Sequence, residues 1–256
     1  MNTTAASRRV SNPISLSDVR DCILKGMNDF AAAPAWGIFF GGGFALAGYA
    51  LIMLLEYYRS VWLILPLALG FPLIGPFAAA GVYEVSRRLA AKQPLEWTAI
   101  LTVIFRQSQK EMAWMAFAVL FIFWVWIYQV RLLLALFMGF SAFSSMDGML
   151  QAFTSPQAAL FLATGTAVGA ALSFVLFATT VISMPMLLDR EVDFVTAIIT
   201  SWRTVLENPV AMLAFGLCVA GATFIALAPF FLGLFLAFPV LGHATWALYK
   251  RAIPPR

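Results

Sequence analysis

The stretch at residues 209–249 reads PVAMLAFGLCVAGATFIALAPFFLGLFLAFPVLGHATWALY, and it decides the fold. Its 41 residues contain no Asp, Glu, Lys or Arg, and one histidine, His243. A helix of about 20 apolar residues crosses the hydrocarbon core of a bilayer, so this length predicts two spans joined by a tight turn. Ala228-Pro229 is the expected turn, because a proline disfavours helical geometry in the residue before it.

Four further stretches without a charge precede it, at residues 31–55, 61–83, 112–130 and 156–188. Pro185 is expected to end or kink the last of these near one membrane surface. Of all residues, 62% are hydrophobic and 11% are charged, whereas soluble domains have about 25% charged residues. This composition excludes a soluble enzyme, a secreted disulfide scaffold and a disordered tail. We therefore predict an all-α fold, a polytopic membrane helix bundle of six transmembrane helices.

The basic residues are distributed unequally between the two sides that six spans define. Fourteen of the sixteen Lys and Arg residues fall on the side of the two termini, and Arg59 and Arg131 fall on the other. Cytoplasmic loops of membrane proteins carry the excess of Lys and Arg. The distribution thus predicts a multi-pass protein whose N-terminus and C-terminus are both cytoplasmic.

Similar strings recur along the chain and indicate an internal repeat. Residues 98–102 read TAILT and 196–200 read TAIIT, while 71–75 read FPLIG and 238–242 read FPVLG. An amphipathic segment also precedes each odd-numbered span. We predict a polar tail at residues 1–16 and a single six-span domain at 17–256. Within it we expect three repeated units, each an interfacial helix plus a helical hairpin, at about 17–88, 95–190 and 192–251. Repeated units of this kind build transport folds, but multiplication of a stable hairpin explains them equally well.

Charged side chains stand where spans two and four leave the lipid, in YEVSRR (83–88) and LLDREVD (187–193). Both strings place an acid close to an arginine. We expect a salt-bridged cytoplasmic collar that contacts lipid head groups or a partner, although a solvated face without such a role has the same pattern. The candidate collar residues are Glu84, Arg87, Arg106, Asp189, Arg190 and Arg203.

His243 is the only histidine and the only candidate intramembrane polar residue. It would serve either as a proton relay or, as we expect, as a structural residue that donates a hydrogen bond to a neighbouring helix. A single histidine excludes multi-histidine haem and metal sites, and we expect no metal site, no cofactor and no catalytic residue. A proline in or near each even-numbered span offers freed carbonyls to a ligand, or only tilts the helix.

Three strings are similar to a known family: GFPLIGPFAAAGVYEVSRR (70–88), PMLLDREVDFVTAIITSWRTVLENP (185–209) and FPVLGHATWALYKR (238–251). They resemble uncharacterised bacterial integral membrane proteins, known as a domain of unknown function. The resemblance covers about residues 18–251 and implies an inner-membrane protein of about six spans. Some relatives are labelled cytochrome c oxidase subunit I-like, but that subunit needs six histidine ligands. An accessory association with a respiratory complex stays open.

These observations favour an inner (plasma) membrane protein without enzymatic activity, although catalysis stays open. The first hypothesis is a structural or accessory protein that docks a partner through its cytoplasmic face. The alternative is a small-solute transporter or channel with a site between the proline-kinked even-numbered helices. The expected partners are the lipid bilayer and either a membrane protein or a second copy of the chain, and no nucleic acid.

Overall fold

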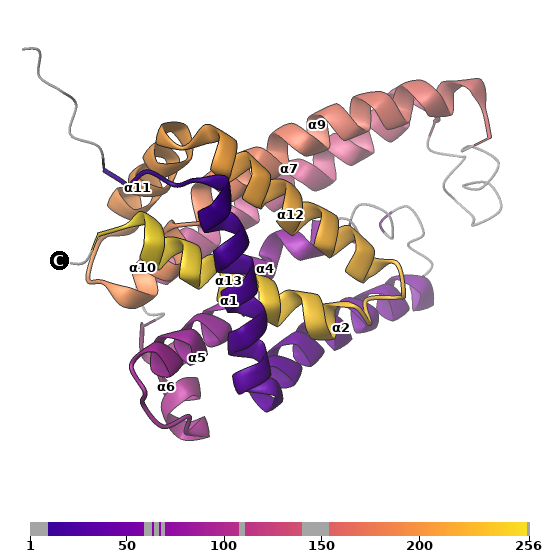
Figure 1. The fold of residues 1–256 in the computed structure, drawn as a ribbon. Coiled ribbons are helices and arrows are strands. Elements are labelled where there is room, and N and C mark those ends of the chain that lie inside the picture. Colours follow the sequence, from indigo (N-terminus) through magenta and orange to yellow (C-terminus); the bar gives the residue numbers. More distant parts are fainter. Residues whose placement is uncertain are drawn as a thin grey trace, which may run out of the picture.

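The computed structural model describes residues 10–58, 63, 67, 70–107, 111–139 and 154–254, and within these ranges all regular secondary structure is helical (Figure 1). The helices are α1 (Leu16–Ala32), α2 (Pro34–Tyr57), η1 (Phe71–Ile74, a 3₁₀ helix), α4 (Gly75–Ala78), α5 (Ala80–Ala90), α6 (Trp97–Gln107), α7 (Glu111–Phe137), α9 (Pro156–Thr180), α10 (Ser183–Asp189), α11 (Phe194–Glu207), α12 (Pro209–Leu227) and α13 (Leu234–Ala252).

Four described helical stretches are long and apolar enough to cross a membrane: Pro34–Tyr57, Glu111–Phe137, Pro156–Asp189 and Pro209–Leu227. They correspond to the expected spans one, three, four and five. Much of the expected second span lies outside the described residues. The expected sixth span is α13, whose last turn carries Lys250 and Arg251. The all-helical membrane fold is thus confirmed, and the count of six stays a prediction.

Prolines begin several of these helices. Pro34, Pro156 and Pro209 stand in the first turns of α2, α9 and α12. A proline suits this place because the first amides of a helix lack intrahelical partners in any case. Ala33 and Asn208, just before two of these prolines, adopt nearly the same backbone angles, φ −138° and ψ 55° against φ −132° and ψ 53°. Each of these two junctions is an elbow, which here means a turn that joins an amphipathic helix to an apolar helix, and the two elbows have the same backbone geometry.

The breaks predicted from prolines in the later helices are also present. α12 ends at Leu227, and the turn at 228–233 carries Pro229 before α13 begins. α9 ends at Thr180 and α10 begins at Ser183, so the helix is interrupted just before Pro185. Pro239, in contrast, lies inside a continuous α13.

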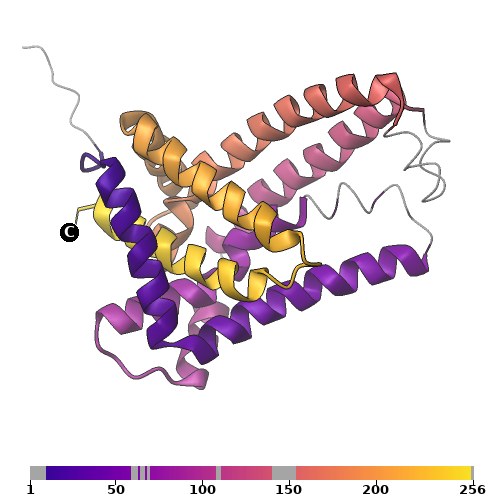
Figure 2. The same ribbon diagram turned by 45° about the vertical axis from the view of Figure 1, so that its right-hand side comes forward.

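α13 lies at the centre of the molecule. Figure 2 shows it between α1, α2 and α12, and the α7–α9 hairpin and α2 extend towards the same side of the molecule. Close helix contacts depend on glycines. A Cβ at Gly26 of α1 would stand 2.5 Å from the carbonyl oxygen of Val240, and one at Gly41 would stand 2.8 Å from that of Phe235. α1 and α2 can therefore approach α13 as closely as they do only with glycine at these positions.

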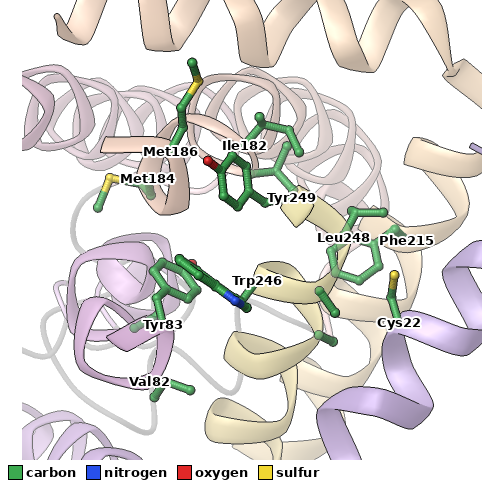
Figure 3. Close-up of a cluster of buried hydrophobic side chains, with 14 of the residues drawn as sticks. Cys22, Val82, Tyr83, Ile182, Met184, Met186, Phe215, Trp246, Leu248 and Tyr249 are labelled. Atoms are coloured by element: carbon green, nitrogen blue, oxygen red, sulfur yellow. The ribbon is translucent and has the colours of Figure 1, made fainter. Parts of the chain in front are cut away.

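Aromatic and sulfur-containing side chains fill the core around α13. Figure 3 shows Trp246 and Tyr249 of α13 facing Tyr83 of α5 and the methionines of α10. Phe44 of α2 is stacked between Phe71 and Phe238, with ring centroids 4.4 and 4.5 Å apart. These two phenylalanines begin the two similar strings FPLIG and FPVLG. The outer halves of α7 and α9 form a small separate cluster of Val130, Leu133, Leu134 and Phe161.

Candidate functional site

Glu84 of the expected collar is fully buried within α5. Its carboxylate accepts hydrogen bonds from Nε and Nη2 of Arg87, both at 2.7 Å, and from Nε of Arg88 at 2.7 Å. The arginines follow Glu84 by three and four residues, so they stand on the same helix face. A buried carboxylate held by two guanidinium groups is a compensated charge, which the fold tolerates at the end of a span.

A second group of polar contacts joins α10 to the end of α13. The Tyr249 hydroxyl donates to Oδ2 of Asp189 at 2.7 Å, and Nζ of Lys250 donates to the same oxygen at 3.2 Å. Arg190 donates from Nε to the Tyr249 hydroxyl and from Nη2 to the carbonyl oxygen of Pro254. Tyr249 thus contacts both Asp189, the last residue of α10, and Arg190, the residue that follows it.

The two groups lie close together at the junction of α5, α10 and α13. The hydrogen bonds that Arg87 makes to Glu84 raise the pKa of its guanidinium above the usual value, and the charge of Asp189 acts in the same direction. The structure therefore brings together four of the six expected collar residues: Glu84, Arg87, Asp189 and Arg190.

The two arginines expected from the interfacial helices are placed differently. Arg203 is exposed on α11 and forms no ion pair with any described residue. Arg106 belongs to α6, but its side chain lies outside the described part of the structure. Arg88, which is not among the expected collar residues, forms an ion pair with Glu84. Its spacing of four residues from Glu84 was the signal that identifies it.

His243 is almost completely buried and faces α5. Its Nδ1 lies 2.6 Å from the Ser86 hydroxyl, which is equally buried. The structure thus gives His243 a hydroxyl partner on a neighbouring helix, as the structural reading expects. Sequence reasoning did not identify Ser86, because 157 residues separate the two positions. Nε2 of His243 and Nε1 of Trp246 have no hydrogen-bond partner among the residues that the structure describes.

The arrangement limits the chemistry that the described residues can perform. A serine beside a histidine is the beginning of a nucleophile–base pair, but Ser86 and His243 are each about 1% exposed, so a substrate carbonyl has no access to the hydroxyl. No group of three or more His, Cys, Asp or Glu residues that could hold a metal ion occurs in the described ranges.

Comparison with known proteins gives one match. Residues 64–189 match a family described as predicted integral membrane protein (DUF2189). This stretch is therefore similar to an uncharacterised membrane protein family. The match contains the string at 70–88 and ends inside the string at 185–209, so it covers less of the chain than the resemblance did. It carries no link to cytochrome c oxidase. Neither the curated proteins nor the solved structures give a match.

Proposed function

We propose that the chain is a non-enzymatic accessory protein of the inner membrane that docks a protein partner on its cytoplasmic face. This face is formed by α1, α5, α10, α11 and the last turns of α13. The observation that carries the proposal is that ion pairs and hydrogen bonds join the helices of this face to one another. These contacts hold polar groups from distant parts of the sequence in fixed positions. A preorganised surface loses little conformational entropy when a partner binds.

The cross-links are ion pairs and buried hydrogen bonds. Every ion pair among the described residues lies on this face, and two of them join distant helices: Asp18 to Arg251 at 2.8 Å and Asp189 to Lys250 at 3.2 Å. Glu111, at the start of α7, also accepts a hydrogen bond from the backbone of Phe194 at 2.9 Å, which fixes the start of α11.

The proposal includes six spans in three repeated units. Its support is the shared elbow geometry at Ala33 and Asn208, together with the stacking of Phe71 and Phe238 on opposite sides of Phe44. Repeated units related in this way would present their amphipathic helices on the same membrane side. The excess of basic residues on that side supports a cytoplasmic location for both termini.

One observation favours the second candidate, a small-solute transporter. Nε2 of His243 and Nε1 of Trp246 have no partner among the described residues and belong to α13, which packs against α5; these helices end two of the even-numbered expected spans. Polar groups without partners are costly in an apolar interior unless a water or ligand binds them. The space around Trp246 is occupied by packed aromatic and methionine side chains (Figure 3), and for this reason we prefer docking to transport.

Site-specific photocrosslinking in cells would test the docking role. A crosslinking amino acid at exposed Arg203 or Glu191 of the cytoplasmic face should give a discrete protein adduct. The matched control is Leu217 on α12, which is 72% exposed on an apolar helix and should crosslink to lipid. Absence of a protein adduct at every cytoplasmic position, with normal protein levels, would contradict docking. Solute uptake by vesicles that contain only the purified protein would favour transport.

A further inference from the structure

Residues 10–15 form an extended strap across the cytoplasmic face. The backbone amides of Val10 and Ser11 donate to the two carboxylate oxygens of Glu207, at 3.1 and 3.0 Å. The Ser11 hydroxyl donates to the same carboxylate at 2.7 Å. One acidic side chain at the end of α11 therefore holds three donors of the strap.

The strap is also bound to the α11–α12 elbow and to α13. Asn208, the elbow residue, donates from Nδ2 to the Ser11 hydroxyl at 3.0 Å and accepts at Oδ1 from the Ile14 amide at 2.8 Å. The backbone amide of Asn12 donates to the carbonyl oxygen of Ala252 at 2.8 Å. Two helices from the opposite end of the chain thus meet through this short segment.

Ser11 is the centre of this network. Its side chain is 5% exposed, and its hydroxyl both donates to Glu207 and accepts from Asn208. A phosphate on this oxygen would carry a charge of about −1.5 to −2 directly beside the Glu207 carboxylate. It would also remove the hydroxyl proton that Glu207 accepts. The closed strap and a phosphorylated Ser11 are therefore incompatible.

The sequence before Ser11 suits a phosphorylating enzyme. Arg8 and Arg9 stand three and two positions before it, in SRRVSN at residues 7–12. Charge patterns next to the acceptor residue are a recurring basis of protein kinase specificity. Strap residues before α1 have no helical hydrogen bonds of their own, and such segments open at low free-energy cost. Opening would expose the hydroxyl to an enzyme.

We propose that Ser11 is a phosphorylation site and that its phosphorylation releases the strap from Glu207 and Asn208. In the reaction the γ-phosphoryl group of a nucleoside triphosphate is transferred to Oγ, the hydroxyl proton passes to the kinase and then to water, and the nucleoside diphosphate leaves. Release exposes the Glu207 carboxylate and the Asn208 amide on the cytoplasmic face. The inference goes beyond the proposed docking role and does not depend on it.

Mass spectrometry of the protein purified from the membranes of its own cells should find phosphate on Ser11. The purified full chain, treated with ATP and a basic-directed protein kinase, should incorporate phosphate that Ser11→Ala abolishes and Ser7→Ala does not. Amide exchange at Val10, Ser11, Asn12 and Ile14 should then accelerate at least tenfold. Absence of phosphate at Ser11 in cells, or unchanged exchange after its phosphorylation, overturns the proposal.

A pair of variants separates charge from size. Ser11→Glu and Ser11→Gln have side chains of similar bulk, but only glutamate adds a negative charge beside Glu207. Ser11→Glu should release the strap much more than Ser11→Gln in the same exchange measurement. Equal exchange in both variants would show that bulk alone opens the strap, which overturns the electrostatic mechanism.

Discussion

His243 illustrates how one polar side chain is accommodated in an apolar bundle. Its ring is buried against Ser86 of α5, at a distance of 2.6 Å. Because each group is shielded from water, removal of one leaves the other without a partner, at a cost of about 1–3 kcal/mol. The hydrogen bond between Ser86 and His243 therefore stabilises the packing of α5 against α13.

A double-mutant cycle would measure this contribution. We expect His243→Leu and Ser86→Ala each to lower the free energy of unfolding by about 1–3 kcal/mol, and the double variant to cost clearly less than their sum. His243→Gln should keep most of the stability, since an amide can still hydrogen-bond. Thr245→Ala is the control, because this hydroxyl bonds only within its own helix, to Leu241. Additive losses would show that the two side chains do not interact.

Asp18 makes the polar face formed by α1, α5, α10, α11 and the end of α13 sensitive to acid. Arg251 donates to its carboxylate, and Ser15 adds further hydrogen bonds, so the pKa of Asp18 falls from 3.8 to about 2. A carboxylate with a depressed pKa stabilises the fold at a pH above its ordinary value. This stabilisation is lost as the pH falls from about 4 towards 2.

Asp18→Asn should accordingly lower stability by about 1 kcal/mol near neutral pH, a value limited by the solvent exposure of the ion pair. Thermal melts in detergent should differ between the variant and the unaltered protein at pH 6 and converge near pH 2. Asp21→Asn, which affects only an exposed contact to Arg20, should have little effect at either pH. A difference that persists at pH 2 would argue against the Asp18 assignment.

At the scale of helices, prolines and glycines explain what the sequence did and did not predict. The starts of α2 and α12 and the turn before α13 follow from Pro34, Pro209 and Pro229, because proline acts locally. On α1 the apolar pattern predicts one face of Val19, Ile23, Met27 and Phe30. Val19 is buried and Ile23 packs against the core, but Cys22, Gly26 and Asp29 are also buried and Met27 is not. α13 approaches so closely that the contact needs a glycine, and Met27 stays 53% exposed.

The charged residues of the collar show the same limit of prediction from sequence. The spacing of Arg87 and Arg88 from Glu84 is enough to bring these side chains together, since residues three or four apart share a helix face, but it does not encode the burial of Glu84. The contact of Asp189 with Tyr249 depends on how α10 meets α13. No local pattern encodes that meeting, because 60 residues separate the two positions.

Glycine substitutions would test the packing of α1 on α13. Gly26→Ala should destabilise the protein by about 1–3 kcal/mol, because the new Cβ would meet the backbone of Val240 and Ala244, which cannot move aside. Gly43 of α2 is the matched control. A Cβ there would meet no atom within 4 Å, so Gly43→Ala should stabilise its helix by about 0.5–1 kcal/mol. Thermal unfolding in detergent distinguishes the two, and equal effects would contradict the close approach.

At the scale of the whole molecule, charge and packing point to the same membrane side. The ends of α5, α10 and α13 meet there. The ion pair of Asp18 with Arg251 links α1 to α13, and the strap at residues 10–15 links α11 to them. The opposite ends of α2, α7 and α9 extend towards the other side (Figure 2) and present mostly apolar side chains. A protein built in this way has one polar, cross-linked face and one apolar region that lipid can surround.

This asymmetry predicts the topology of the chain. Basic residues retain cytoplasmic loops during insertion, and fourteen of the sixteen fall on the side of α1, α11 and the end of α13. A fluorescent reporter that folds only in the cytoplasm should therefore be active after residue 256, and a periplasm-dependent phosphatase should be active within residues 56–60. Exchange of the two reporters should reverse both signals. Phosphatase activity at residue 256 would place the C-terminus outside the cytoplasm and contradict the predicted topology. The α1 end would then lie on that side as well, because Asp18 and Arg251 are in contact at 2.8 Å.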